Sequence, residues 1–522
     1  MEKKVTKGNS IIGGTVSLTL STLIVKILGL IYKIPLANIL GDEGMGVFNS
    51  AYTVYAFFYL LCTAGVPKAV MILVSEARAK GKEADENMII KTALNLFFSI
   101  GAACCVLFVV FAKPLARLVG NSAAWATMIA VAPSIVFISL AGVIRGYLNA
   151  GMRFLDVAVS QIIEGVGKLA IGLIAGIAAL KCGFSLELVS AMTITGVSFG
   201  SFIGLIYLVM ISKIRITKEK VGQKRFRRKI LSISIPITIS AAIMSLTGII
   251  DLGLIMRNLS FIGYSEAEAS ALYGNYTTLA MPMFNFAISI ITPISLAFLP
   301  TFTKAIVSFD KEEFEKIESD SLNLSSFVSA PLVAGLAIYS SEILNLLFPT
   351  SDIAIGSLLL CLLLPAIVFS SMLLITNTAL EAGGRVKAPL VSMSLGCLAK
   401  ITVSLLLIRN SSFGISGAPI GTVCCYAVAL LVSSFVYRIH FKSSLPLFST
   451  CIPFYLFAFA ASIVSRTGYL LMNEKYGEVM SLGIAIIFCA VLYFVLSILF
   501  YLTKYKGKVK IAKYTKLLNK NC

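Results

Sequence analysis

The sequence predicts an all-α membrane protein of about 14 transmembrane helices, arranged as two pseudo-symmetric six-helix lobes plus two C-terminal helices. Three observations lead to this class. Hydrophobic residues make up 58% of the 522 positions and charged residues only 13%, too few to cover a soluble chain of this length. Apolar runs of about 20 residues recur from end to end. Similar segments also return in the same order in the two halves.

The apolar runs and the breaks between them define the individual spans. No cleavable signal peptide is expected, because the first run is long and carries internal lysines. The expected spans are centred near residues 25, 58, 100, 135, 167, 199, 243, 286, 334, 366, 398, 427, 459 and 490.

Basic residues orient these spans. With a cytoplasmic N-terminus, about 30 lysines and arginines fall in cytoplasmic segments and about six in the opposite loops, as the positive-inside rule requires. We therefore expect a multi-pass protein of a bacterial plasma membrane with both termini in the cytoplasm. The net charge of +19 then reflects topology and contact with anionic membrane lipids, and no nucleic-acid partner is expected.

Cysteine, histidine and nucleotide-binding patterns indicate no catalytic chemistry. Most of the 11 cysteines lie in apolar runs, at spacings that match neither a metal site nor a disulfide framework. His440 is the only histidine, and "EGVGKL" around Lys168 lacks the residues of a phosphate-binding loop. We expect no enzyme activity, metal or cofactor, and we leave open coupling to an ion gradient or to the membrane potential.

Two registers relate the halves of the chain. At an offset of 232, "LNAGMR" at 148–153 matches "LEAGGR" at 380–385, and Lys168 falls on Lys400. At an offset of 225, the first expected span matches the seventh. This second register pairs Thr15 with Ser240, Thr22 with Thr247, Lys26 with Asp251, and Phe48 with Tyr273.

The repeat predicts the domain organisation. Six spans per half is an even number, so both halves keep one orientation, which suits alternating access. The expected parts are an N-terminal lobe over 1–213, a basic cytoplasmic linker over 214–229, a C-terminal lobe over 230–442, two further spans over 443–503, and a basic cytoplasmic tail over 504–522.

A polar stripe runs along the first expected span, around "VKILGLIYKIP" at 25–35. A lysine exposed to lipid near the bilayer centre costs about 2.5–3.5 kcal/mol, so the two lysines are expected to face a watery cavity or a counter-charge. For the second of them, Lys33, snorkelling to the interface is the alternative. The stripe consists of Thr15, Thr19, Thr22, Lys26, Gly29 and Lys33.

Other spans carry polar residues that are candidates for the same cavity. Asp251 is the expected counter-charge to Lys26, and Glu164 and Lys168, one helical turn apart, are placed to pair with each other. The amides Asn49 and Asn275 occupy near-equivalent places in spans 2 and 8. Candidates for a gate or interface are Arg145, which an interfacial anchor role would explain equally well, and Arg153, Arg385 and Lys400.

Lysines on one helical face indicate an anionic substrate. Lys26 and Lys33 are seven residues apart, which places them about 10 Å apart along one face of a helix. Lysines bind phosphate as point charges, so a diphosphate fits such a pair, with Lys168 as a further cation.

Several segments together resemble a known family: "KILGLIYKIPLANILGDEGMGVFNSAY", "AGVPKAVMILVSEARAKG", "IRGYLNAGMRF" and "EAEASALYGNYTTLAMPMFNF". They resemble the stage V sporulation protein B branch of polysaccharide-biosynthesis membrane proteins. The superfamily of this branch also holds multidrug extruders, O-unit flippases and the murein lipid II flippase. The resemblance implies a fourteen-helix transporter, with two six-helix lobes around a central cavity, that moves undecaprenyl-diphosphate-linked sugars to the outer leaflet.

The resemblance also bears on single residues. Lys26 and Lys33 are similar in place to the cationic residues on the first helix of the lipid II flippases. Those flippases also carry an arginine on the eighth helix, where this chain has Asn275 and Tyr276. This departure weakens the expectation that lipid II is the substrate, and it leaves the expected fold unchanged.

The function expected from all of this is a flippase for a lipid-linked peptidoglycan or polysaccharide precursor, acting as a monomer. The alternative is a cation-coupled multidrug exporter, which would depend on an acidic cavity. A membrane-embedded glycosyltransferase ranks lower, because no external loop exceeds about 20 residues.

Overall fold

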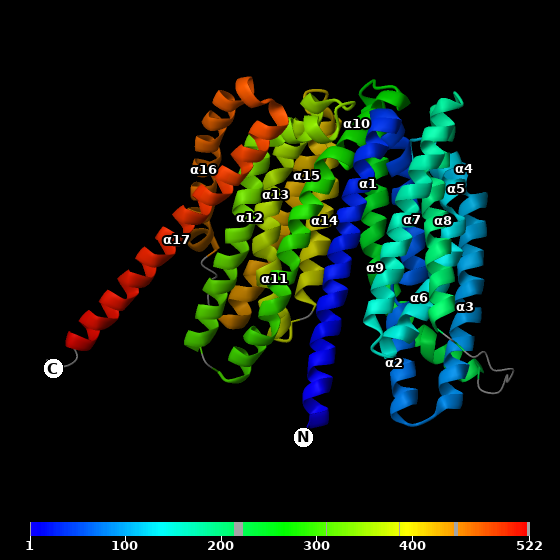
Figure 1. The fold of residues 1–522 in the computed structure, drawn as a ribbon, viewed down its shortest axis with the longest axis horizontal. Coiled ribbons are helices and arrows are strands. Elements are labelled where there is room, and N and C mark those ends of the chain that lie inside the picture. Colours follow the sequence, from blue (N-terminus) through cyan, green and yellow to red (C-terminus); the bar gives the residue numbers. More distant parts are fainter. Residues whose placement is uncertain are drawn as a thin grey trace. The chain divides into compact units, whose positions relative to one another are not determined.

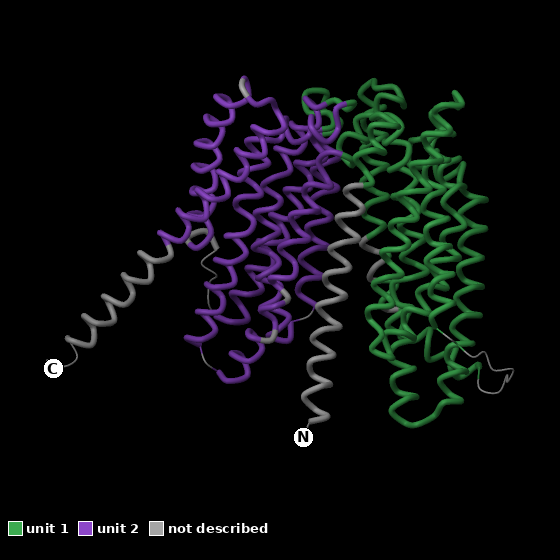
Figure 2. Tube along the Cα trace, in the orientation of Figure 1, with its two compact units in different colours: residues 1–278, 350–352, 408–415 green, residues 279–349, 353–407, 416–522 purple. Residues whose placement is uncertain are grey.

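The computed structural model describes residues 2–212, 214, 223–309, 311–385, 387–442 and 447–518. Side chains are described within these ranges from residue 32 to residue 500. The exceptions are residues 236, 240, 241, 243, 244, 296, 300, 447–449 and 475. Contacts divide the chain into two compact units, coloured in Figure 2. Unit 1 comprises residues 1–278, 350–352 and 408–415, and unit 2 comprises residues 279–349, 353–407 and 416–522.

Helices form all the regular structure of unit 1 in the described residues (Figure 1). A helix satisfies every backbone donor and acceptor within its own segment, as a span in lipid requires. The helices are α1 (Glu2–Thr63), α2 (Val66–Ala79), α3 (Glu83–Val110), α4 (Ala112–Val119), α5 (Ala124–Val131), α6 (Pro133–Ala150), α7 (Phe154–Lys181), α8 (Leu186–Ser212), α9 (Gln223–Phe261) and α10 (Glu266–Asn275).

A short π-helix, η1 (Tyr276–Ala280), follows α10 directly, and the division between the units falls within it. The remaining helices belong to unit 2, except that the last residue of α14 and the first two of η2 are assigned to unit 1. They are α11 (Met281–Val307), α12 (Lys311–Leu347), α13 (Ile353–Ala382), α14 (Ala388–Ile408), the 3-10 helix η2 (Gly414–Ser416), α15 (Gly417–Phe441), α16 (Leu447–Tyr476) and α17 (Glu478–Leu518).

Twelve segments of the described chain are long and apolar enough to cross a membrane. They run from Tyr32–Ala79 to Glu478–Phe500 and contain twelve of the fourteen expected span centres. The prediction of an all-helical, multi-pass membrane protein is therefore confirmed. The other two centres, near residues 25 and 243, fall where the side chains lie outside the described set, and these two spans stay predictions.

Helix α1 consists of two arms that meet at Gly41. This glycine has φ 64° and ψ −177°, a left-handed conformation that a residue with a Cβ atom adopts at a steric cost. The sequence predicts separate spans centred near 25 and 58, and the break at Gly41 lies between them. Lys33 therefore lies on the first arm, while Asn49 and Tyr52 lie on the second.

A glycine ridge on α8 sets its distance from α7. Gly196, Gly200 and Gly204 recur at every fourth residue, a spacing that lets two membrane helices approach closely. A Cβ atom on Gly200 would lie 2.6 Å from the carbonyl oxygen of Glu164, and one on Gly196 would lie 2.5 Å from that of Lys168. The ridge thus holds α7 at Glu164 and at Lys168, and Lys168 is part of the candidate site.

The repeated hexapeptide forms the same turn in both places. In the first copy, Met152 has φ 56°, and the amide of Arg153 donates to the carbonyl of Leu148 at 3.0 Å. In the second copy, the matching Gly384 has φ 79°, and the amide of Arg385 donates to the carbonyl of Leu380 at 2.8 Å. Both helices, α6 and α13, therefore end in the same left-handed cap.

Candidate functional site

Five polar and aromatic side chains of unit 1 gather where the two arms of α1 meet α7 and η1. We call this group the cation–aromatic cluster and define it as Tyr32, Lys33, Asn49, Tyr52 and Lys168. Unpaired polar groups are costly inside a membrane, so each of these side chains needs a partner or a function.

Lys168 of α7 lies against two aromatic rings. Its Nζ atom is 5.1 Å from the ring centroid of Tyr32 and 4.8 Å from that of Tyr52, within the range of a cation–π contact. Tyr32 is buried, whereas Tyr52 is 37% exposed. The rings hold the ammonium group in place without neutralising its charge.

Lys33 of α1 contacts the backbone of the π-helix. Its Nζ atom donates to the carbonyl oxygen of Thr277 at 3.0 Å. A π-helix changes the backbone hydrogen-bond pattern of a helix, and such segments are common at functional sites. The contact explains how the half-buried Lys33 is held, since no carboxylate of the described residues pairs with it.

The two predicted asparagines come close to the same π-helix. Asn49 is 6% exposed, and its Nδ2 atom donates to Thr278 Oγ1 at 2.8 Å. Asn275, the last residue of α10, is 2% exposed, and its Oδ1 atom has no hydrogen-bond partner within the described residues. Close packing brings α1 and α10 together, since a Cβ atom on Gly274 would lie 2.1 Å from the carbonyl oxygen of Asp42.

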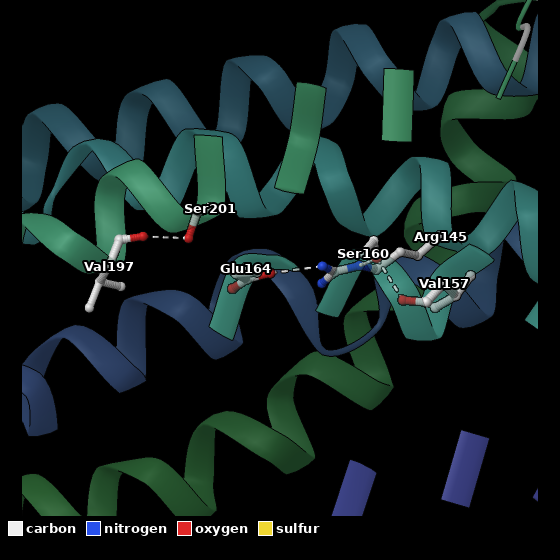
Figure 3. Close-up of polar contacts among 6 residues, drawn as sticks. All are labelled: Arg145, Val157, Ser160, Glu164, Val197 and Ser201. Atoms are coloured by element: carbon white, nitrogen blue, oxygen red, sulfur yellow. Dashed lines mark hydrogen bonds and ion pairs between the residues drawn. The ribbon is translucent and has the colours of Figure 1, made fainter. Parts of the chain in front are cut away.

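Glu164 pairs with Arg145 (Figure 3). An Nη2 atom of Arg145 is 2.7 Å from Glu164 Oε2, and the Nε atom donates to Ser160 Oγ at 3.1 Å. The side chains of Arg145 and Glu164 are 11% and 25% exposed. The expected pairing of Glu164 with Lys168 is therefore wrong, because α6 brings a guanidinium within reach of the carboxylate while Lys168 packs on aromatic rings.

A stripe of tyrosines along the second arm of α1 was not predicted. Tyr52, Tyr55 and Tyr59 succeed one another at three- and four-residue spacing, with ring centroids 5.6 Å and 6.0 Å apart. The sequence signal was this helical spacing, "YTVYAFFY". The stripe begins at the ring that contacts Lys168 and continues along the helix.

The remaining predicted residues lie as follows. The side chain of Lys26 is outside the described set, so its pairing with the half-buried Asp251 of α9 stays a prediction. Arg153 bonds Asp156 at 2.6 Å and the carbonyl of Ile211 at 3.1 Å, at the start of α7. In unit 2, Arg385 donates to His440 Nδ1 at 3.2 Å, and Lys400 is half-buried on α14.

Many membrane-crossing helices, with cationic side chains held inside one unit, are typical of membrane transporters. Sequence comparison gives the family: residues 11–306 match the one described as "Polysaccharide biosynthesis protein", and the chain belongs to it. The prediction of a transporter-family protein rather than an enzyme agrees with the similarity of the chain to lipid II flippase MurJ in sequence and in fold.

Curated relatives agree with this assignment. Stage V sporulation protein B of Bacillus subtilis (strain 168) is 23% identical over 420 residues, which are 78% of this chain and 80% of the relative. Lipid II flippase MurJ of the same organism is 22% identical over 458 residues, 83% of each protein.

Solved structures share the fold. The inward closed conformation of lipid II flippase MurJ has a TM-score of 0.69 at 18% identity, with 94% of this chain and 100% of that chain covered. An inward-facing multidrug resistance MATE family transporter of the MOP superfamily has a TM-score of 0.67 at 14% identity, covering 82% and 98%. At these identities the likeness concerns the fold alone.

Proposed function

We propose that this protein is a flippase that moves a lipid-linked sugar diphosphate from the cytoplasmic to the outer leaflet by alternating access. A charged headgroup cannot cross hydrocarbon unaided, and a transporter of this family supplies a polar path for it. The relatives are in keeping with such a substrate, since one of them is named a lipid II flippase.

The cation–aromatic cluster is the observation that carries the proposal. Lys33 is held by a backbone carbonyl and Lys168 by two aromatic rings, so neither charge is neutralised by a carboxylate in the described structure. Two such lysines offer point charges to a diphosphate. The exposed ring of Tyr52 beside Lys168 offers an apolar face to a sugar.

The proposed architecture has fourteen spans, in two six-span halves followed by two more. Twelve candidate spans support it, and the identical caps at Met152 and Gly384 support the repeat that relates the halves. The proposed lobes keep the expected boundaries, 1–213 and 230–442. The two units, which are defined by contacts between residues, divide the chain differently. They place α9 and α10 in unit 1, whereas the sequence repeat places both helices in the C-terminal lobe.

The proposed orientation places both termini in the cytoplasm of a bacterial cell, as the distribution of basic residues favours. An outward-moving anion would then be helped by an inside-negative membrane potential, which is worth about 2.3 kcal/mol per charge at 100 mV.

The second candidate, a cation-coupled multidrug exporter, is favoured only by the fold shared with a MATE transporter. Such an exporter needs a carboxylate free to bind a cation. In unit 1, Glu164 is already engaged by Arg145 at 2.7 Å. The flippase therefore fits the charges of the described site better.

The experiment compares two lysine variants with a matched control. Lys33→Gln and Lys168→Gln each remove one charge from the cluster, while Lys181→Gln removes one from the exposed end of α7. Cells whose own copy is deleted carry each variant, and the lipid-linked precursors of each leaflet are quantified. The double variant Lys26→Gln with Lys33→Gln tests the predicted stripe.

We expect the cluster variants to reduce outer-leaflet precursor about tenfold, as loss of one charge-assisted contact implies, while membrane levels and the control stay unchanged. The precursor that accumulates inside deletion cells identifies the glycan. Normal translocation in the Lys26 and Lys33 double variant would count against the proposal. Drug susceptibility that rises on deletion, with no precursor accumulating, would favour the exporter.

A further inference from the structure

The first two turns of α9 carry a dense basic face that the transport site does not use. Four cations recur at helical spacing, and with Ser232 they line a surface hollow of about 560 Å³. Lys224, Arg225 and Arg228 are exposed and Lys229 is half-buried. None of the four forms an ion pair within the described residues.

This arrangement is unfavourable for the helix by itself. The N-terminal end of a helix carries partial positive charge and favours acidic residues, yet the first turn of α9 contains none. Lys224 with Arg228, and Arg225 with Lys229, are like-charge pairs at four-residue spacing, which repel. Both effects reverse when an anion occupies the hollow.

The protein holds the basic face in a fixed position. Phe226 and Ile230 point to the opposite side and are 8% and 0% exposed, packed in a core with residues of α2 and α3 such as Val70 and Met88. The backbone that carries the cations is therefore fixed before any ligand arrives, which lowers the entropy cost of binding.

One acidic group also belongs to the surroundings of this face. Glu76 of α2 interacts electrostatically with Lys229 and Arg225, but its carboxylate is hydrogen-bonded to Lys80. Among the described residues, one carboxylate that is already bonded to Lys80 leaves a local excess of positive charge on this face. The ligand that fits is thus an anion.

An apolar stripe continues from the hollow along α9. Ile235, Ile239, Leu246 and Ile250 are 46%, 54%, 43% and 38% exposed, at spacings of four, seven and four residues that continue the face of Arg228 and Ser232. Cationic and apolar surface in succession along one helix suits a ligand with an anionic head and a hydrocarbon chain.

We propose that this surface is a binding site for an anionic phospholipid. The phosphate lies in the hollow lined by Lys224, Arg225, Arg228 and Lys229, and an acyl chain lies along the stripe of Ile235, Ile239, Leu246 and Ile250. Juxtamembrane basic clusters attract such headgroups. The site is independent of the transported substrate and stands whether or not the proposed function holds.

Adjacent arginines give a matched pair of variants. Arg228 lines the hollow, whereas the neighbouring Arg227, also exposed, does not. Four purified full-length proteins are stripped of lipid: the unchanged protein, the single variants Arg228→Gln and Arg227→Gln, and a double variant that combines Arg225→Gln with Arg228→Gln. Each protein is then titrated with phosphatidylglycerol or with phosphatidylcholine. Bound lipid is counted by native mass spectrometry, with inorganic pyrophosphate as competitor.

We expect phosphatidylglycerol to bind and phosphatidylcholine not to bind. Arg228→Gln should weaken binding about fivefold and the double variant about 30-fold, from the usual contribution of one basic residue near anionic lipid. Ile239→Asn should weaken phosphatidylglycerol binding too, through the acyl chain.

Three results would overturn the proposal. Equal losses in Arg227→Gln and Arg228→Gln would mean that general surface charge, and no defined site, attracts the lipid. Full competition by pyrophosphate, with Ile239→Asn unaffected, would mean that a soluble phosphate is the ligand. Equal binding of both lipids would mean that the site does not recognise the negative charge of the headgroup.

Discussion

At the scale of single residues, three cations inside unit 1 are held in three different ways. Arg145 has a carboxylate partner at 2.7 Å, Lys33 has a backbone carbonyl at 3.0 Å, and Lys168 has two aromatic rings. Only the first arrangement neutralises the charge. The two lysines thus keep their charge available to an anion, and Arg145 serves the packing of α6 on α7.

The ring of Tyr52, rather than its hydroxyl group, is expected to position Lys168. Tyr52→Phe keeps the ring and should leave precursor translocation close to that of the unchanged protein. Tyr52→Leu removes a contact worth about 0.5–2 kcal/mol, so translocation should fall about two- to 30-fold. Transport assays at equal membrane levels check this, and equal effects of the two substitutions would contradict the role of the ring.

The Arg145–Glu164 pair should contribute to stability. In a double-mutant cycle with Arg145→Gln and Glu164→Gln, we expect a coupling energy on the order of 1 kcal/mol, because both side chains are mostly buried. The more exposed pair of Arg153 and Asp156 serves as the control and should couple by less than about 0.5 kcal/mol. Unfolding in detergent measures both, and equal coupling would argue against burial as the cause.

The candidate site could be predicted in part from single residues. Lys33, Lys168 and Asn49 were found because a polar group in an apolar run is conspicuous in a sequence. Their partners were not, since each partner is set by packing between distant segments: Lys33 meets Thr277 across 244 positions. The wrong pairing of Glu164 with Lys168 has the same origin, because one-turn spacing says nothing about the arginine on α6.

At the scale of elements, the glycine ridge of α8 positions α7. The ridge contacts the backbone of α7 beside Glu164 and Lys168, so packing between two helices fixes where both side chains emerge. Small residues serve this purpose in lipid, where no hydrophobic force drives helices together.

A larger residue in the ridge should separate the two helices. Gly200→Val places a Cβ atom about 2.6 Å from the carbonyl oxygen of Glu164, and overpacking of this kind costs about 1–3 kcal/mol. We expect a lower unfolding temperature in detergent. Gly253→Ala on α9, with nothing within 4 Å of its added Cβ atom, is the control and should unfold as the unchanged protein does.

The elements themselves were largely predictable, because the length of an apolar run is a local property of the sequence. Helix α1 shows the limit. The sequence predicts two spans with a break between them, but the backbone conformation of Gly41 is what places that break at a single residue. The π-helix at Tyr276–Ala280 had no sequence signal, since its residues are compatible with an ordinary helix.

At the scale of the whole molecule, the proposed substrate is an anion that crosses the electric field of the membrane. The sign of the membrane potential sets the direction in which such a substrate gains energy, while the distribution of basic residues favours the proposed orientation of the chain. A sugar diphosphate with two negative charges that crosses the full field gains about 4.6 kcal/mol at 100 mV.

Outward translocation should therefore accelerate with an inside-negative potential. Proteoliposomes with a potassium gradient and valinomycin impose a potential of either sign, and leaflet-specific labelling of the lipid-linked precursor measures the rate. We expect a faster rate at inside-negative potential and a slower one after its collapse. A rate that ignores the potential but follows a sodium or proton gradient would indicate ion coupling instead.

The π-helix after Asn275 has a consequence for how the chain tolerates changes in length. A π-helical turn is equivalent to one extra residue inserted into an α-helix. Deleting Thr277 would therefore restore the regular hydrogen-bond ladder of an α-helix through this segment. The carbonyl that Lys33 now contacts would be lost, so a single deletion in this otherwise ordinary segment should be worse tolerated than most substitutions there.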